Sequence, residues 1–527
     1  MYELFEATKK KNLLQVKKIK LTDHKLNFAI GLQEQRTMYP KYTPLTYACL
    51  IGDIRIVKYL LENKAKVNGV PDESYTPLYA ACVSGKKEIV DFLLEKKAKV
   101  NKVNKSGMSA VFGCVEKDNV DLIKYLETKG ADLTVKCQKG GLVRHATFAH
   151  NAPKCLSYFT EKKLEVDTYD EPSGQSTLYE LALSFLYYNT KDEKKKISTL
   201  DSMKKLIDSG ADPNLLSKRE DREETPLHLA CKYSNDELIT FLLDNGADPN
   251  SKSKRDDTPL LSLFFLKREP GSTSRKVVTL KSLEKLFQHK ADPNMANTSG
   301  ITPFLYLMST HVRRRVKDDI KLVEMFLDNG ADLKSLDFKG NTPLHLAAAK
   351  AFAEACKVMI NRKADVNAEN SNKETPFFSV ARCIDSSTAS KETWELLLAN
   401  GAKIQKNSDG DYPHFVASKR NRVRIILCMI ANGVKSNTLD QEGNTFMHLL
   451  AKDYENKEDG TSNTADLKYI NDIIGTSAKK EYKLHLKNND GNNFYDIILP
   501  KLNESDKTNL EETLKKKGYD INETEDR

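Results

Sequence analysis

The 527-residue sequence has little of what disulfide-rich, zinc-binding or membrane-spanning proteins need. Its nine cysteines are an odd number at irregular spacings, and none form a Cys-x-x-Cys pair. This pattern argues against a disulfide framework and a zinc cluster and favours a reducing compartment. The longest apolar run, near residues 260–266, is far shorter than the roughly 20 residues that span a bilayer. The first six residues include acids and no apolar core segment, so we expect no signal peptide and a cytoplasmic protein, with access to the nucleus left open.

Motifs of catalysis are scarce as well. There is no Gly-x-Ser-x-Gly elbow of the kind that holds a nucleophilic serine. Residues 271–276 resemble a phosphate-binding loop only superficially, because the second glycine and its spacing are missing. We therefore expect a protein that is not an enzyme and that needs no cofactor or metal ion.

Positive charge is not concentrated in this sequence. The net charge of +9 is small against 83 basic and 74 acidic residues, and the lysines are spread along the chain. That distribution argues against nucleic acid as the main partner. Two basic clusters, 313–315 and 419–424, leave open a contact with nucleic acid or an anionic membrane surface. Binding through phosphates would weaken steeply as the salt concentration rises.

What the sequence does contain is a repeat. Thr-Pro-Leu, a small-residue helix, a Leu-Leu pair and Ala-Asp-x-Asn recur, most completely from Thr225 and from Thr342. Many successive copies are 33 residues apart. The aligned Thr position is occupied in turn by Thr43, Thr76, Ser109, Leu142, Ser176, Thr225, Thr258, Thr302, Thr342, Thr375, Tyr412, Thr445 and Asn493.

Each residue type that recurs in the repeat has a structural reason. Thr before Pro suits the start of a helix, because its hydroxyl caps the first turn and proline donates no amide there. Glycines such as Gly246, Gly330 and Gly401 suit a left-handed helix end. Cys49, Cys82 and Cys231 take a position that needs a small buried residue.

A 33-residue period that opens with Thr-Pro-Leu-His-x-Ala resembles the ankyrin-repeat superfamily, over roughly residues 1–520. The resemblance implies an all-α solenoid of about 13 helix-turn-helix repeats with β-hairpin loops. It also implies that His145, His228, His345 and His448, at the fourth position of the motif, hydrogen-bond the hairpins. We divide the chain into an N-terminal capping helix (3–19) with its linker (1–37), a first array of repeats (38–170), repeats with insertions (171–453), and an insertion with divergent C-terminal capping repeats (454–527).

Several repeats are longer than 33 residues, and the extra residues fall between the two helices. We expect polar loops or helix extensions, either a second recognition surface or tolerated loop growth. The insertions are residues 189–196, 267–276, 311–317, 385–391 and 454–464.

The resemblance also implies a non-enzymatic scaffold or adaptor, which we expect to be monomeric. Its partner would be a folded protein or an extended peptide, bound across the hairpin tips and the inner helix faces. Alternatives are the anion-directed contact through the basic clusters and an effector that recruits a host enzyme. Aromatic residues such as Phe338 would be the strongest anchors. The candidate contact residues are Asp72, Glu73, Tyr75, Arg222, Glu224, Lys232, Tyr233, Phe338, Lys339, Asn341, Lys350, Arg382, Lys419 and Arg420.

Overall fold

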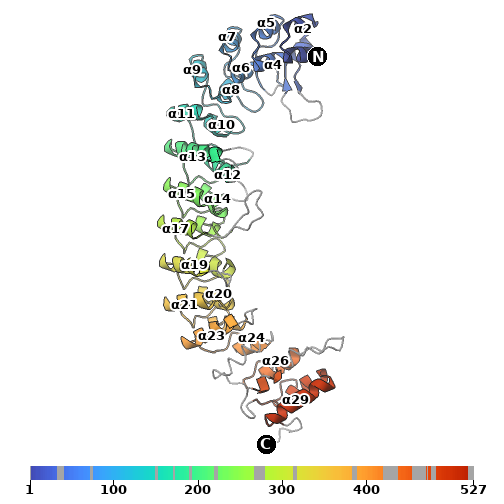
Figure 1. Cartoon of the computed structure of the whole chain (residues 1–527), viewed down its shortest axis with the longest axis vertical. Helices are drawn as coiled ribbons and strands as arrows, with labels where there is room; N and C mark the ends of the chain where they lie inside the picture. Colours follow the sequence, from blue (N-terminus) through green and yellow to red (C-terminus); the bar gives the residue numbers. More distant parts are fainter. Residues whose placement is uncertain are drawn as a thin grey trace. The chain divides into compact units, whose positions relative to one another are not determined.

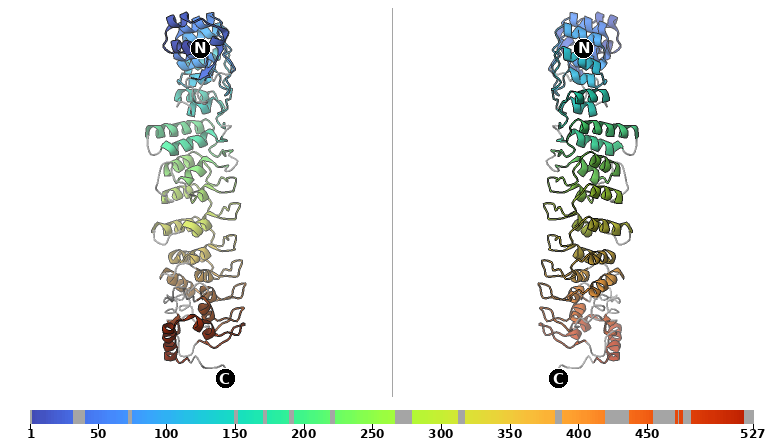
Figure 2. Two further views of the ribbon diagram at one scale, coloured as in Figure 1. Left: turned by 90° about the vertical axis from the view of Figure 1, so that its right-hand side faces the viewer. Right: turned by 90° about the vertical axis from the view of Figure 1, so that its left-hand side faces the viewer.

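The chain forms stacked helix pairs in two compact parts, the N-terminal part (Met1–Lys290) and the C-terminal part (Ala291–Arg527). Among the described residues, the one sheet is a two-stranded antiparallel pair, β1 (Ile30–Gly31) with β2 (Lys41–Tyr42). In each part the hairpins project from one side of the helices (Figure 2). The computed structural model describes residues 2–31, 41–71, 75–148, 152–169, 173–188, 193–218, 223–265, 279–311, 317–382, 388–418, 437–453, 470–471, 473–475 and 482–519.

The N-terminal part contains seven of the aligned repeats (Figure 1). Their first helices are α4 (Pro44–Ile51), α6 (Pro77–Ser84), α8 (Ala110–Val115), α10 (Leu142–Phe148), α12 (Thr177–Tyr188), α14 (Pro226–Lys232) and α16 (Pro259–Ser262). Their second helices are α5 (Ile54–Glu62), α7 (Lys87–Glu95), α9 (Val120–Thr128), α11 (Pro153–Glu161), α13 (Glu193–Asp208), α15 (Asp236–Asp244) and α17 (Leu280–Gln288).

The C-terminal part contains the other six, so all thirteen aligned positions mark the start of a first helix. These first helices are α18 (Pro303–Tyr306), α20 (Pro343–Ala349), α22 (Pro376–Ala381), α24 (Pro413–Ser418), α26 (Phe446–Asp453) and α28 (Phe494–Ile498). A π-helical turn, η1 (Leu307–His311), continues α18, and a 3-10 turn, η2 (Leu499–Lys501), continues α28. The second helices described here are α19 (Lys317–Asp328), α21 (Ala353–Asn361), α23 (Thr388–Ala399) and α29 (Glu504–Lys516).

The N-terminal cap is a helix pair rather than the single helix expected over residues 3–19. Helix α1 (Tyr2–Lys9) ends before Lys11, whose φ is 53°, and α2 (Leu13–Lys18) begins where the Asn12 side chain accepts a hydrogen bond from Gln15 N at 3.0 Å. Helix α1 packs on α4 and α2 packs on α5. The pair, followed by the short α3 (Asp23–Asn27), therefore stacks as a further degenerate repeat.

Local chemistry explains why the first helices begin where they do. The hydroxyls of Thr43, Thr76, Thr258 and Thr302 each accept a hydrogen bond from the backbone N–H three residues later at 3.2 Å, with proline in the first turn. The position expected to hold a small buried residue does so, as Cys49, Cys82 and Cys231 are fully buried. These side chains let neighbouring first helices pack closely.

Two of the insertions extend helices. Residues 193–196 lie in α13, which has 16 residues, and residues 388–391 lie in α23, which has 12, whereas α5 and α7 have nine each. The expectation of helix extension is confirmed there. The insertions at 267–276 and 454–464 lie outside the described residues.

A row of asparagine side chains, here called the asparagine ladder, joins successive repeats. The Asn101 amide donates to Gly130 O at 2.8 Å and its oxygen accepts from Asp132 N at 2.8 Å. Asn214 makes the same pair of bonds to Gly246 O and Asp248 N. In the C-terminal part the equivalent residues are Asn294 and Asn367. The Asn of Ala-Asp-x-Asn thus satisfies main-chain groups of the next repeat.

Lysines occupy a backbone conformation that usually favours glycine. After the second helix, the left-handed residue is glycine in some repeats, such as Gly246 (φ 88°) and Gly330 (φ 82°). In others it is Lys64, Lys97, Lys163, Lys290 or Lys363, with φ between 57° and 70°. A side chain with a Cβ is strained in this region by about 1 kcal/mol.

We expect Lys97→Gly to raise the free energy of unfolding by about 0.5–1 kcal/mol, because the relief of strain exceeds the entropy that glycine loses on folding. Hydrogen exchange of the α7 backbone amides in the full chain would measure the change locally. Lys96→Gly is the matched control: Lys96 is the helix C-cap residue with φ −79°, so glycine there should destabilise. An unchanged or lower stability for Lys97→Gly would contradict the expectation.

Candidate partner-binding surface

Five hairpins of the C-terminal part have the same turn geometry, which residues 297–301 before them also have. We call residues 337–341, 370–374, 407–411, 440–444 and 488–492 the hairpin strip. In each, an Asp or Asn stands five residues before the aligned Thr position, and its side-chain oxygen accepts two backbone N–H groups at 2.7–3.1 Å. These residues are Asp337, Asn370, Asn407, Asp440 and Asn488. The turns are therefore held by a side chain at their base.

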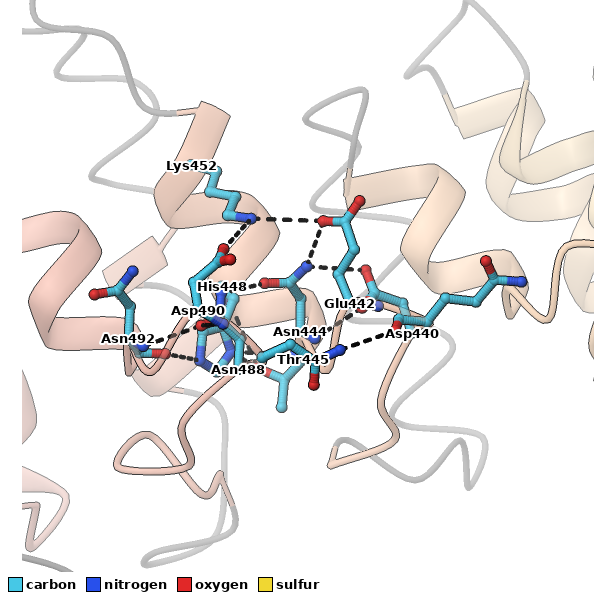
Figure 3. Close-up of polar contacts among 11 residues, drawn as sticks. Asp440, Glu442, Asn444, Thr445, His448, Lys452, Asn488, Asp490 and Asn492 are labelled. Atoms are coloured by element: carbon cyan, nitrogen blue, oxygen red, sulfur yellow. Dashed lines mark hydrogen bonds and ion pairs between the residues drawn. The ribbon is translucent and has the colours of Figure 1, made fainter.

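Adjacent hairpins of the strip are also bonded to each other. Ser371 N donates to Lys339 O at 3.0 Å, and Asn489 N donates to Glu442 O at 2.9 Å. The Asn488 amide donates to Asn444 Oδ1 at 2.8 Å (Figure 3). These bonds fix the register between neighbouring repeats.

Glycine is required where the hairpins approach most closely. Gly340 has a φ of 74°, and a Cβ on it would lie 2.8 Å from the backbone N of Ser371 in the next hairpin. Such contact would force the next hairpin to move. The close spacing of the hairpins thus depends on this residue type.

The residues at the hairpin tips are exposed. Phe338 is 78% exposed, and Lys339 Nζ lies 5.5 Å from the centre of its ring. Lys452 Nζ lies 3.6 Å from Glu442 and 3.9 Å from Asp490, whose side chains are mostly exposed (Figure 3). The tips therefore present an aromatic ring and charges of both signs on a fixed backbone. The exposed tip residues are Phe338, Lys339, Ser371, Asn372, Ser408, Asp409, Gln441, Glu442, Asn489 and Asp490.

Motif histidines anchor the hairpins from beneath. Nδ1 of His228, His345 and His448 accepts the backbone N–H of the preceding Thr at 3.1–3.3 Å. Nε2 then carries the proton and donates to the carbonyl oxygen of the next hairpin at 2.7–3.2 Å. Burial lowers the pKa of His228 to about 4 and also lowers those of His345 and His448. The structural role implied for these three is confirmed. His145 is buried with its ring edge-on to Phe112 at 5.1 Å.

Two predicted contact residues are buried against each other. Glu224 and Lys232 form an ion pair in which their side chains are 4% and 11% exposed. Glu224 stands one residue before Thr225, and Lys232 stands seven residues after it, at the end of α14. The two side chains meet because the end of α14 lies next to the base of the hairpin that precedes it. We therefore assign this pair to the framework and not to the contact surface. Glu374 and Arg382 repeat the pair, with Arg382 41% exposed.

The other predicted contact residues are distributed as follows. Phe338 and Lys339 are exposed tip residues. Asn341, half-buried, accepts from the Asn370 amide at 2.8 Å. Tyr75, in the hairpin before Thr76, and Tyr233 and Lys350, at the ends of α14 and α20, are half-buried, and burial lowers the pKa of Lys350. The remaining candidates, Asp72, Glu73, Arg222, Lys419 and Arg420, lie outside the described residues, as do both basic clusters, 313–315 and 419–424.

Sequence reasoning missed the residues that hold the strip. Asp440 and Asn488 were not candidates, although an Asp or Asn stands five residues before the Thr position in each hairpin of the strip. That spacing is a readable signal of a turn closed by an Asp or Asn side chain. Lys452, which lies between two hairpins, stands seven residues after the aligned Thr of its repeat, as Lys232 and Arg382 do in theirs.

Two of the described cysteine thiols, on α14 and α21, are fully buried. Burial raises the pKa of the Cys231 and Cys356 thiols. In the part of the chain that the structure describes, no group of three or more His, Cys, Asp or Glu is placed to hold a metal ion. Nor does any helix there have the length and apolar character needed to cross a membrane.

Comparison with known proteins identifies the repeat. A family model described as ankyrin repeats in three copies matches residues 4–104, 71–137, 195–263, 277–370 and 314–407. A homolog of transient receptor potential cation channel subfamily A member 1 from Caenorhabditis elegans is 33% identical over 141 residues, which are 27% of this chain and 10% of the relative. Ankyrin repeat protein OPG189 of Variola virus is 33% identical over 93 residues, or 18% of this chain and 16% of the relative.

An L-asparaginase from Dirofilaria immitis is 26% identical over 206 residues, which are 34% of this chain and 32% of the relative. The chain thus covers at most about a third of the length of these relatives. The family model, by contrast, matches well over half of the chain, in the helix pairs described above. On that match, the chain belongs to the ankyrin-repeat family.

Proposed function

We propose that this chain is a non-enzymatic scaffold or adaptor that binds a partner protein across its hairpin tips and the inner face of its first helices. The observation that carries the proposal is the division of roles within the hairpin strip. Buried or half-buried residues such as Asn488 hold the turns, while the tip residues beside them are exposed and differ in charge and size. A fixed backbone with variable exposed side chains is suited to recognition, because little conformational entropy is lost on binding.

The titratable groups support a structural and not a catalytic reading. Strongly lowered histidine pKa values often mark active sites. Here the shifted groups, His228 and His345, are bonded to the turns on both sides of the ring. Both ring nitrogens of each histidine are therefore occupied by hydrogen bonds that hold the fold.

Phe338→Ala tests the proposal. Loss of a central aromatic anchor should weaken partner binding by about 2 kcal/mol, or roughly 30-fold. Affinity purification from cells with quantitative mass spectrometry would compare the wild type with Phe338→Ala. Ile197→Ala is the control, since Ile197 is 55% exposed but lies on α13 away from the hairpins. A folded Phe338→Ala protein that keeps every partner at wild-type abundance would show that this tip is not part of the contact surface.

A further inference from the structure

One carboxylate of the N-terminal part stands where the helix dipole disfavours it. Glu116 is the C-cap residue of α8, at the carbonyl end of the helix, where cations are favoured. It lies seven residues after the aligned Ser109. Four later repeats have a base at this position, Lys232, Arg382, Lys419 and Lys452, and none has an acid. The inner face therefore carries the opposite charge here.

A row of tyrosines from two earlier repeats ends at this carboxylate. The Tyr79 hydroxyl donates to Glu116 Oε1. The Tyr75 ring stacks on that of Tyr79, with centroids 4.7 Å apart and an interplanar angle of 9°, and the Tyr42 ring lies 5.8 Å from Tyr75. Burial and the negative charge of Glu116 raise the pKa of Tyr75, and burial, Tyr75 and Glu116 raise that of Tyr42 to about 12. Glu116 is thus electrostatically close to three phenol groups.

An apolar surface continues from the tyrosines. Tyr42 is buried with Phe5 and Tyr47, and the partly buried Leu50, Ile51 and Tyr75 pack over them. Leu50 stands seven residues after Thr43, as Lys232 stands seven residues after Thr225. The inner face therefore has an apolar side chain here, where the repeat at Thr225 has a charged one. A half-buried carboxylate at the edge of an apolar, aromatic surface results.

We propose that Tyr75 and Glu116 bind the ammonium or guanidinium group of a Lys or Arg side chain that a partner protein presents on an apolar segment. The proposal rests on the proposed function, that this chain binds proteins through its inner face, and adds the chemistry of one contact. A cation at this place offsets both the carboxylate and the carbonyl end of α8. The Tyr75 hydroxyl oxygen, near enough to Glu116 to sense its charge, can accept a hydrogen bond from the same cation. The apolar flanks of the segment cover Leu50 and Ile51.

A random peptide library displayed on phage, selected on the full chain, provides an unbiased probe. Wild-type protein should enrich peptides with a Lys or Arg between apolar residues, and Glu116→Gln protein should not. Glutamine keeps an oxygen for the Tyr79 hydroxyl and removes only the charge. Glu88→Gln is the matched control, because Glu88 is an exposed acid of α7 whose side chain is 70% exposed.

A selected peptide, synthesised with Lys and with norleucine, then allows a double-mutant cycle by calorimetry. Glu116→Gln and the norleucine peptide should each weaken binding about tenfold, and combining them should add no further loss. Tyr75→Ala should also weaken the Lys peptide, with the circular dichroism spectrum of the protein unchanged.

The outcomes separate the two proposals. Peptides that bind with equal affinity to wild-type and Glu116→Gln protein would overturn the cation site while leaving protein binding intact. Failure of the wild type to select any peptide, together with Phe338→Ala keeping all its cellular partners, would overturn both.

Discussion

Replacing Lys232 with alanine should lower the free energy of opening of α14 by about 3–5 kcal/mol. The change leaves the Glu224 carboxylate, only 4% exposed, without the ammonium group that neutralises it. An unpaired buried charge loses its hydration without compensation. Hydrogen exchange of the α14 and α16 backbone amides would measure the loss locally, which is appropriate because long repeat arrays do not unfold as a single cooperative unit.

The double variant Glu224→Leu with Lys232→Met is the control for this experiment. Replacing both partners with apolar residues of similar volume removes the charge and keeps the packing. We expect it to recover most of the stability lost in Lys232→Ala. Equal exchange rates in Lys232→Ala and wild type would mean that the pair contributes nothing to the fold.

Acidification should destabilise the repeat at Thr225 through His228. Burial lowers the pKa of His228 from 6.5 to about 4. The unfolded chain therefore binds a proton at this residue below about pH 6.5, whereas the folded chain does so only near pH 4. Stability is unaffected at higher pH and is lost progressively from pH 6.5 to pH 4, by about 3 kcal/mol in total. Below pH 4 this residue causes no further loss.

Urea denaturation monitored by hydrogen exchange at several pH values between 7.5 and 5 would detect about 2 kcal/mol of this loss. His228→Gln is the control, since glutamine does not titrate yet can still donate a hydrogen bond. Its stability should be lower at neutral pH but flatter with pH than that of the wild type. A wild-type profile as flat as that of His228→Gln would contradict the lowered pKa.

Much of the fold could be predicted because its determinants are local. The Thr hydroxyl caps a turn three residues away, and the following proline suits the same turn, so the phase of each first helix can be read from two residues. The His position was equally readable, since His448 bonds Thr445 beside it and the next hairpin one repeat away. Recurrence of such signals at 33 residues then places the repeats.

Which candidate contact residues are exposed could be predicted less well, because exposure is not a local property. Nothing in the spacing of Glu224 and Lys232 shows that they bury each other, since this depends on how helix and hairpin pack. Phe338 stands four residues before its Thr, whereas Glu224 stands one residue before, and it is exposed because that position is the tip and not the base of the turn. The N-terminal helix pair was missed for a different reason: its break depends on one left-handed lysine and one asparagine cap.

The asparagine ladder makes the chain modular. The side chain of Asn214 belongs to one repeat, but both groups it bonds, Gly246 O and Asp248 N, belong to the main chain of the next. Any sequence that keeps the same backbone path can supply those two groups. Repeats can therefore be duplicated, deleted or exchanged with those of another protein while these main-chain joints stay intact, so that the exposed side chains of the stack can change by recombination of whole modules.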